Sequence, residues 1–125
     1  MNALEFYDLH QNFSWVVVVG NGMAGAWALG AHRLTRLRTR ALWWFTALAE
    51  CTMFVQVIIG VVLINTYGYD IPRFHAFYGF VGIIAIAIVY SYRIQMRHRL
   101  YLLYGLGGLF IMGLGIRAML LGELR

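Results

Sequence analysis

Four long apolar blocks divide the sequence, and they limit the folds that it can adopt. Each block has about 20 residues, the length at which an α-helix crosses the hydrocarbon of a bilayer. Backbone groups in lipid must satisfy their own hydrogen bonds, so each block is expected to be a helix despite its β-branched residues. The sequence therefore predicts an all-α fold, an integral membrane four-helix bundle with up-down topology. The single membrane domain covers residues 1–125, with spans at about 13–31, 42–64, 74–92 and 100–121.

The composition supports a membrane location. Apolar residues make up 62% of the chain and charged residues 12%, and the mean hydropathy is +0.70. Soluble domains contain about 25% charged residues, and a soluble fold of this size could not hide so much apolar surface. Membrane lipid is thus the expected surroundings. The connections between the blocks are too short to form a site for a soluble substrate, and no nucleic-acid partner is expected.

Arginine sets the expected orientation in the membrane. The basic side chains other than histidine are all arginine, and most of them lie in the connections 32–41 and 93–99. Because basic connections stay on the cytoplasmic side, we expect these two connections to be cytoplasmic and both termini to be non-cytoplasmic. The location is then the cell (inner or plasma) membrane, crossed several times. The acidic first residues predict that the first block is retained as a helix and is not a cleaved signal.

Small residues recur at helical spacing in three of the blocks. Such faces let two helices approach closely in lipid. Two interpretations are open: the faces pack within this chain, or they dock onto the helices of a neighbouring protein. The candidate packing residues are Gly20, Ala24 and Ala28 in the first block, Gly79 and Gly82 in the third, and Gly108 and Gly115 in the fourth.

Glu50, Gln56 and Asn21 are polar side chains that lie well inside the blocks. Glu50 lies well within the second block, and an ionisable group at that depth is a functional candidate. The alternative is a protonated carboxyl group that is hydrogen-bonded to a neighbouring helix. Gln56 and Asn21 are expected to form hydrogen bonds between helices. Arg117, close to the end of the fourth block, is expected to extend its guanidinium group to the outer surface.

The histidines suggest a cofactor site. His10 and His75 are placed at the outer boundary, whereas His32 and His98 are placed at the inner boundary of the same two helices. Imidazoles from facing helices can hold a haem iron from both sides. One haem b at His10 and His75, or a haem at each pair, is therefore a hypothesis. The alternative is that these polar rings anchor the helices at the membrane surface.

The remaining motifs point away from catalysis. There is no Cys-x-x-Cys, no His-Glu-x-x-His and no pairing of a nucleophile with a base, so we expect no enzyme, no metal site and no cofactor. The layout resembles that of accessory subunits of bacterial respiratory complexes. In outline it is also similar to four-helix b-type cytochrome domains, whose haem histidines lie deeper in the membrane.

Three functions follow from these observations. The leading hypothesis is a non-catalytic accessory subunit that packs against a larger integral membrane protein complex, in respiration or transport. The first alternative is a haem b-binding electron-transfer subunit that uses His10 and His75. The second is a small oligomeric transporter or channel that uses Glu50.

Overall fold

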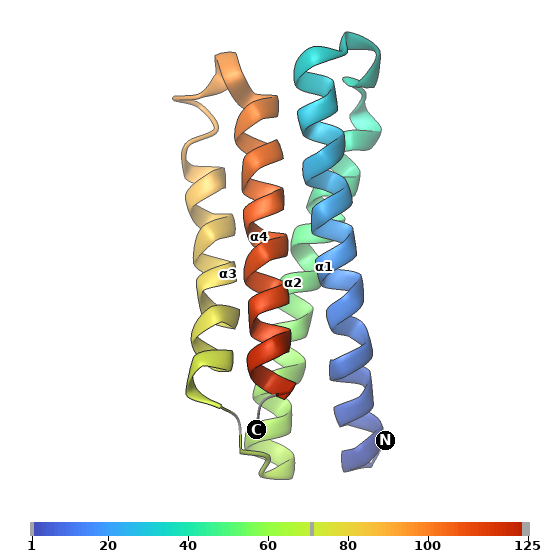
Figure 1. Ribbon diagram of the computed structural model, residues 1–125, viewed down its shortest axis with the longest axis vertical. Helices are drawn as coiled ribbons and strands as arrows, with labels where there is room; N and C mark the ends of the chain where they lie inside the picture. The colour runs from blue at the N-terminus through green and yellow to red at the C-terminus, as the bar shows by residue number, and fades with distance from the viewer. Residues whose placement is uncertain (1, 71, 124–125) are drawn as a thin grey trace.

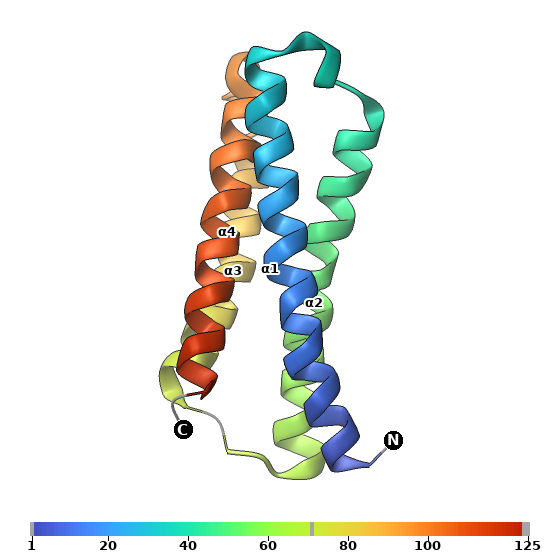
Figure 2. The same cartoon turned by 45° about the vertical axis from the view of Figure 1, so that its right-hand side comes forward.

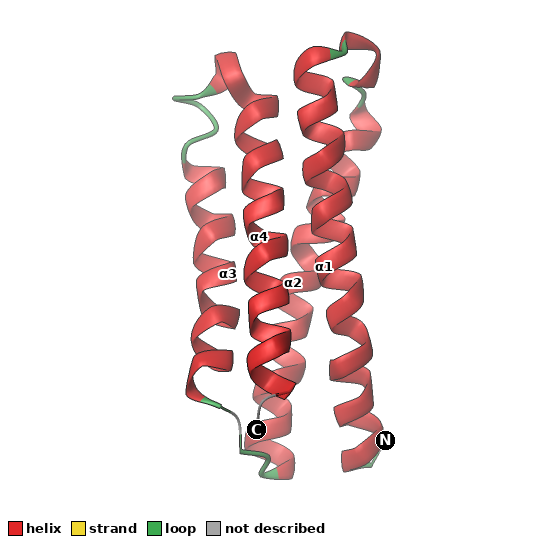
Figure 3. Ribbon diagram, in the orientation of Figure 1, coloured by secondary structure: helices red, strands yellow, loops and turns green. Residues whose placement is uncertain are grey.

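The computed structural model describes residues 2–70 and 72–123, and in these residues the chain is helical without any strand (Figure 3). All four α-helices are long and apolar enough to cross a membrane. The prediction of an all-α chain with four candidate spans is thereby confirmed. The elements are α1 (Ala3–Arg33), η1 (Thr35–Leu37), α2 (Arg40–Tyr67), α3 (Arg73–Ser91), η2 (Arg97–Arg99) and α4 (Leu100–Glu123).

Two of the helices continue beyond the apolar blocks. Helix α1 begins at Ala3 because Asn2 and Glu5 form a capping box, in which the Asn2 side chain accepts from the Glu5 amide at 2.9 Å. This box satisfies amide groups that the first turn leaves free. Helix α2 ends at Tyr67. Gly68 follows as its C-cap, with a φ of 72° in the left-handed conformation. Because α1 begins at Ala3, His10 lies two turns inside this helix.

The helices run side by side along the long axis, and both chain ends lie at the same end of the molecule (Figure 1). Helix α1 packs most extensively against α4 and then against α2, α3 packs against α4, and α2 and α3 touch least. The helices thus form a ring in which α1 and α3 are diagonally opposite. The end with residues 33–40 and 93–99 is called the arginine end below, and the end with His10 and His75 the histidine end. Figure 2 shows α1 and α2 spreading apart towards the arginine end.

Helices α1 and α4 touch through their backbones. A Cβ atom added at Gly25 would lie 2.8 Å from the carbonyl oxygen of Gly105 and 2.8 Å from the amide of Leu109. A Cβ added at Gly108 would lie 2.8 Å from the Cα of Gly25. Ala28, one turn after Ala24, is fully buried beside this crossing. The smooth faces of α1 and α4 therefore pack on each other within the chain.

The other small residues have separate surroundings. A Cβ at Gly82 would meet the methyl group of Met53 at 2.8 Å, and one at Gly115 would meet Val18 at 3.0 Å. A Cβ at Gly20 would make an ordinary contact with Ala49, at 3.7 Å, whereas one at Gly79 would meet open space. The absence of a side chain at Gly82 thus leaves room for the Met53 side chain between α2 and α3. Gly79 takes no part in close packing among the described residues.

A layer of buried apolar side chains crosses the middle of the molecule and is called the Met53 layer here. All four helices contribute to it, so it closes the space between them. Its exposed fractions are 8% or less. The layer consists of Val17, Met53, Ala85, Ile86, Ile111 and Leu114.

Arg38 closes the end of α1 at the arginine end. Its Nε donates to the carbonyl of Ala31 at 2.7 Å and its Nη2 donates to the carbonyl of His32 at 3.0 Å. The guanidinium group also lies over the ring of Tyr101, 4.8 Å from its centroid. A cation at this position satisfies carbonyl groups that the last helical turn leaves free.

Replacing Arg38 by alanine should lower the free energy of unfolding by about 1 kcal/mol, because two helix-end carbonyls lose their donor. Unfolding in mixed micelles, followed by the helical circular dichroism, measures this change. Arg36→Ala is the matched control, since Arg36 lies in the same connection and its side chain donates no hydrogen bond to any described residue. Equal stabilities of the two variants would contradict the capping role.

Candidate functional site

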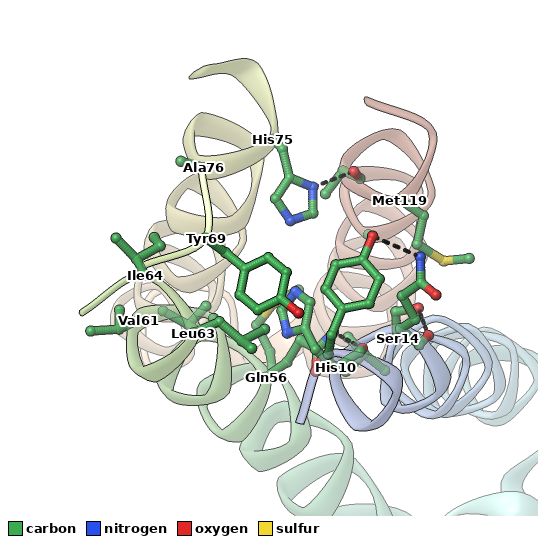
Figure 4. Close-up of a pocket in the computed structure, with 18 of the residues that line it drawn as sticks. His10, Ser14, Gln56, Val61, Leu63, Ile64, Tyr69, His75, Ala76 and Met119 are labelled. Carbon is green, nitrogen blue, oxygen red and sulfur yellow. Dashed lines mark hydrogen bonds between the residues drawn. The ribbon is translucent and has the colours of Figure 1, made fainter. Parts of the chain in front are cut away.

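A cavity of about 280 Å³ opens between the helices at the histidine end (Figure 4). Helix α1 contributes His10, α2 contributes Gln56 and Gly60, α3 contributes His75, and α4 contributes Ala118. All four helices thus meet around one space. Helices α1 and α2 both extend past their apolar blocks, so both still contribute lining residues to this space near the expected membrane boundary.

The two histidines approach each other across this cavity. Their ring centroids are 6.0 Å apart and the ring planes are inclined by 73°. Two imidazoles on opposite sides of one metal ion, each bonded to it at roughly 2 Å, have their ring centres roughly 6 Å apart. The inclination is no obstacle, because each ring is free to turn about its bond to the metal. The separation would therefore allow both rings to hold one metal ion between them.

A backbone contact fixes the orientation of His75. Its Nδ1 lies 2.5 Å from the carbonyl oxygen of Ala118. The carbonyl can only accept, so Nδ1 carries the hydrogen and donates it. In the neutral ring Nε2 is then without a proton and is able to bind a metal, and a donated Nδ1–H of this kind is the usual support of a metal-binding histidine.

The surroundings of His10 leave polar atoms unsatisfied. Its ring lies against α2 at Gly60, where an added Cβ would come within 3.3 Å of Cε1. Gln56 donates to the carbonyl of His10 at 2.7 Å. Within the described residues, the Nδ1 of His10 and the Oε1 of Gln56 are buried without a hydrogen-bond partner. Such atoms are rare, and two in one cavity indicate a place where a ligand or water completes the structure.

Aromatic and apolar side chains form the remaining wall. Tyr7 and Tyr69 stack with their ring centroids 5.2 Å apart, and the hydroxyl of Tyr7 accepts from Gln11 at 3.2 Å. Trp15 and Phe80 also line the cavity. A mostly apolar cleft with a few polar groups is the usual character of a cofactor or small-molecule site, and these rings suit a flat ligand.

The other predicted polar residues lie elsewhere. Asn21 is buried and donates to the carbonyls of Val17, at 2.9 Å, and Ala49, at 3.1 Å, so it joins α1 to α2. Glu50 lies on the arginine-end side of Met53 and does not line the cavity. The structure therefore separates Asn21, Glu50 and Gln56 into three environments.

The inner histidines and Arg117 do not form a comparable site. His98 is exposed in η2, and no ring contact joins it to His32 in the described part of the chain. Arg117 lies over the ring of Tyr78, with 6.0 Å between its Cζ and the ring centroid. Only the outer pair of histidines is brought together.

Two site residues were not found from the sequence. Gly60 lies four residues after Gln56, so helical periodicity could have placed both on one face. Ala118 acts through its backbone carbonyl, for which no sequence signal exists.

Among residues 2–70 and 72–123, no group of three histidine, cysteine, aspartate or glutamate side chains is arranged to hold a metal ion. Two imidazoles are few ligands for a bare ion. They are sufficient for an iron whose other four ligands come from a macrocycle.

Comparison of the chain with protein-family models, with curated proteins and with solved structures gave no match.

Proposed function

We propose that the protein is a membrane-bound electron carrier that holds haem b between His10 and His75. The observation that carries this proposal is the approach of the two imidazoles, 6.0 Å apart on diagonally opposite helices, across a cavity open between them. The hydrogen bond from His75 to Ala118 supports it by leaving Nε2 free. The tyrosine, tryptophan and phenylalanine side chains would face the flat macrocycle.

Ligation by two histidines favours electron transfer over catalysis. Held by both His10 and His75, the haem would transfer electrons and would not bind oxygen or a substrate. Haem supplies one-electron chemistry when bound. The chain's own part is to orient the two rings and to shield the site with apolar side chains, which tune the reduction potential.

The accessory-subunit hypothesis drew in part on small-residue faces that could dock onto a partner. Of these residues, Gly108 packs on α1 at Gly25 within the chain, whereas Gly79 meets open space. A haem protein can still belong to a larger respiratory complex. With the connections 32–41 and 93–99 in the cytoplasm, the haem would lie near the opposite surface and exchange electrons there.

An absorption spectrum tests the proposal. The protein, purified in mild detergent from cells supplied with haem, should show a Soret band, and reduction with dithionite should sharpen two visible bands typical of a six-coordinate iron. Conversion of the bound pigment to its pyridine complex identifies the haem type. Protein that shows no Soret band, even after incubation with excess haem, would contradict the proposal.

A further inference from the structure

Glu50 is an acidic residue far from the ends of α2, with no other acidic residue near it in the sequence. It is the sole acidic residue between Asp8 and Asp70 in the sequence, and it lies about 15 Å along α2 from Arg40 by helical rise. Its side chain is partly buried, and its carboxyl group forms no hydrogen bond or ion pair in the described residues. Placing an ionisable group at such a depth is costly, which calls for a functional explanation.

Polar groups lead from Glu50 towards the arginine end. The ring of Tyr104 packs against Trp43 of α2 at a centroid distance of 5.2 Å. Trp43 lies two helical turns before Glu50, so Tyr104 faces the side of α2 that carries Glu50.

Thr46 adds an independent observation on the same face. It lies one turn before Glu50, and its side chain is only 7% exposed. Its Oγ1 is buried without a hydrogen-bond partner in the described residues. A hydroxyl group both donates and accepts hydrogen bonds, so a water molecule or a proton carrier at this position would be bound by Thr46.

The Met53 layer lies on the other side of Glu50. Met53 follows Glu50 by three residues and is 3% exposed, and Gly82 leaves it the room to extend towards α3. The side chains of this layer carry no group that could transfer a proton. They separate Glu50 from the histidine cavity, which begins at Met53 and Gln56.

The titratable groups around Glu50 are few. Helix α1 has none between His10 and His32. At the arginine end, Tyr101 and Tyr104 of α4 both pack against Trp43 of α2. Tyr90 lies at the end of α3, and Arg93 lies just after that helix. On α2 the neighbouring Cys51 is exposed on the outside of the molecule.

We propose that Glu50 binds and releases a proton that enters from the arginine end past Tyr104 and Thr46, and that the Met53 layer closes this proton site off from the histidine cavity. The carboxyl group alternates between its neutral and its charged form. The proton passes along hydroxyl groups and water on one face of α2. This site does not depend on the proposed haem, because Glu50, Thr46 and Tyr104 do not line the cavity.

Infrared spectroscopy of the protein in lipid nanodiscs tests the proposal. A protonated carboxyl group in an apolar site has a separate carbonyl stretching band, which should decrease as the buffer becomes alkaline and be absent in Glu50→Gln. Transfer into D₂O shifts this band, and the rate of the shift reports how fast the proton exchanges. Thr46→Val should slow the exchange severalfold, because it removes the hydroxyl group and keeps the shape.

Thr52→Val is the matched control. Thr52 is on the same helix, but its hydroxyl donates to the carbonyl of Ala49 at 2.5 Å and lies outside the route. The exchange rate of the Glu50 carboxyl band in Thr52→Val should match that of the wild type. Met53→Ala should speed up this exchange, because it opens the Met53 layer. Tyr104→Phe is a second variant of the route in case Thr46→Val does not fold. A carboxyl band that Glu50→Gln leaves unchanged, or equal exchange rates in the route and control variants, would overturn the proposal.

Discussion

His75→Ala should abolish stable haem binding. The site has two protein ligands, and removal of one leaves the iron attached at a single side while His75's hydrogen bond to Ala118 is lost as well. Changing a mere supporting partner of a metal ligand costs about 10- to 100-fold in affinity, so loss of the ligand itself should exceed about 100-fold. Titration of the purified variant with haem, followed at the Soret band, measures the change. His10→Ala should behave in the same way.

Two further variants make this result specific. His98→Ala removes an exposed imidazole at the arginine end and should leave haem binding unchanged. His75→Met should retain haem, because methionine is also an axial ligand, and it should raise the reduction potential. Haem binding by His75→Ala at the affinity of the wild type would show that the histidine pair is not the site.

The sequence was sufficient to predict the helices, because the hydropathy of each segment can be judged without knowing how the segments pack. Four apolar blocks, each near the length of a bilayer, predicted four candidate spanning helices, and these are present. The first turns of α1 were outside that signal. They contain polar residues, and the capping box of Asn2 and Glu5 extends the helix through them. The sides of the membrane on which the connections lie remain a prediction.

The candidate site was partly visible in the sequence. His10 and His75 were paired because both fall at the same predicted depth, which needs only the helix lengths and directions. That they meet across a diagonal depends on the packing order of the helices, which hydropathy does not encode. Gln56 and Asn21 were expected to form hydrogen bonds between helices, and Glu50 was a functional candidate because of its depth in the second block. The intervening Met53 layer separates Glu50 from Gln56, and it becomes apparent only when the helices are packed.

Replacing Gly25 by alanine should destabilise the protein by about 1–3 kcal/mol, the usual cost of overpacking. The added Cβ would meet backbone atoms of Gly105 and Leu109 at 2.8 Å, and backbone atoms cannot rotate away as a side chain can. Helices α1 and α4 would have to move apart along the most extensive contact in the molecule. Unfolding in mixed micelles measures the loss. Gly113→Ala is the matched control, since its Cβ meets open space and should leave stability equal or slightly higher.

Combining Gly25→Ala with Gly108→Ala tests whether the two glycines serve one contact. Each Cβ would press on the opposite helix at the same crossing, because a Cβ at Gly108 lies 2.8 Å from the Cα of Gly25. Once the first alanine has pushed the helices apart, the second should find part of its space already available. The loss of stability in the double variant should therefore be smaller than the sum of the single losses, since residues in contact are not additive. Strictly additive losses would mean that the backbones do not meet at this crossing, and the small residues of α1 and α4 would again be free to face a partner in the membrane.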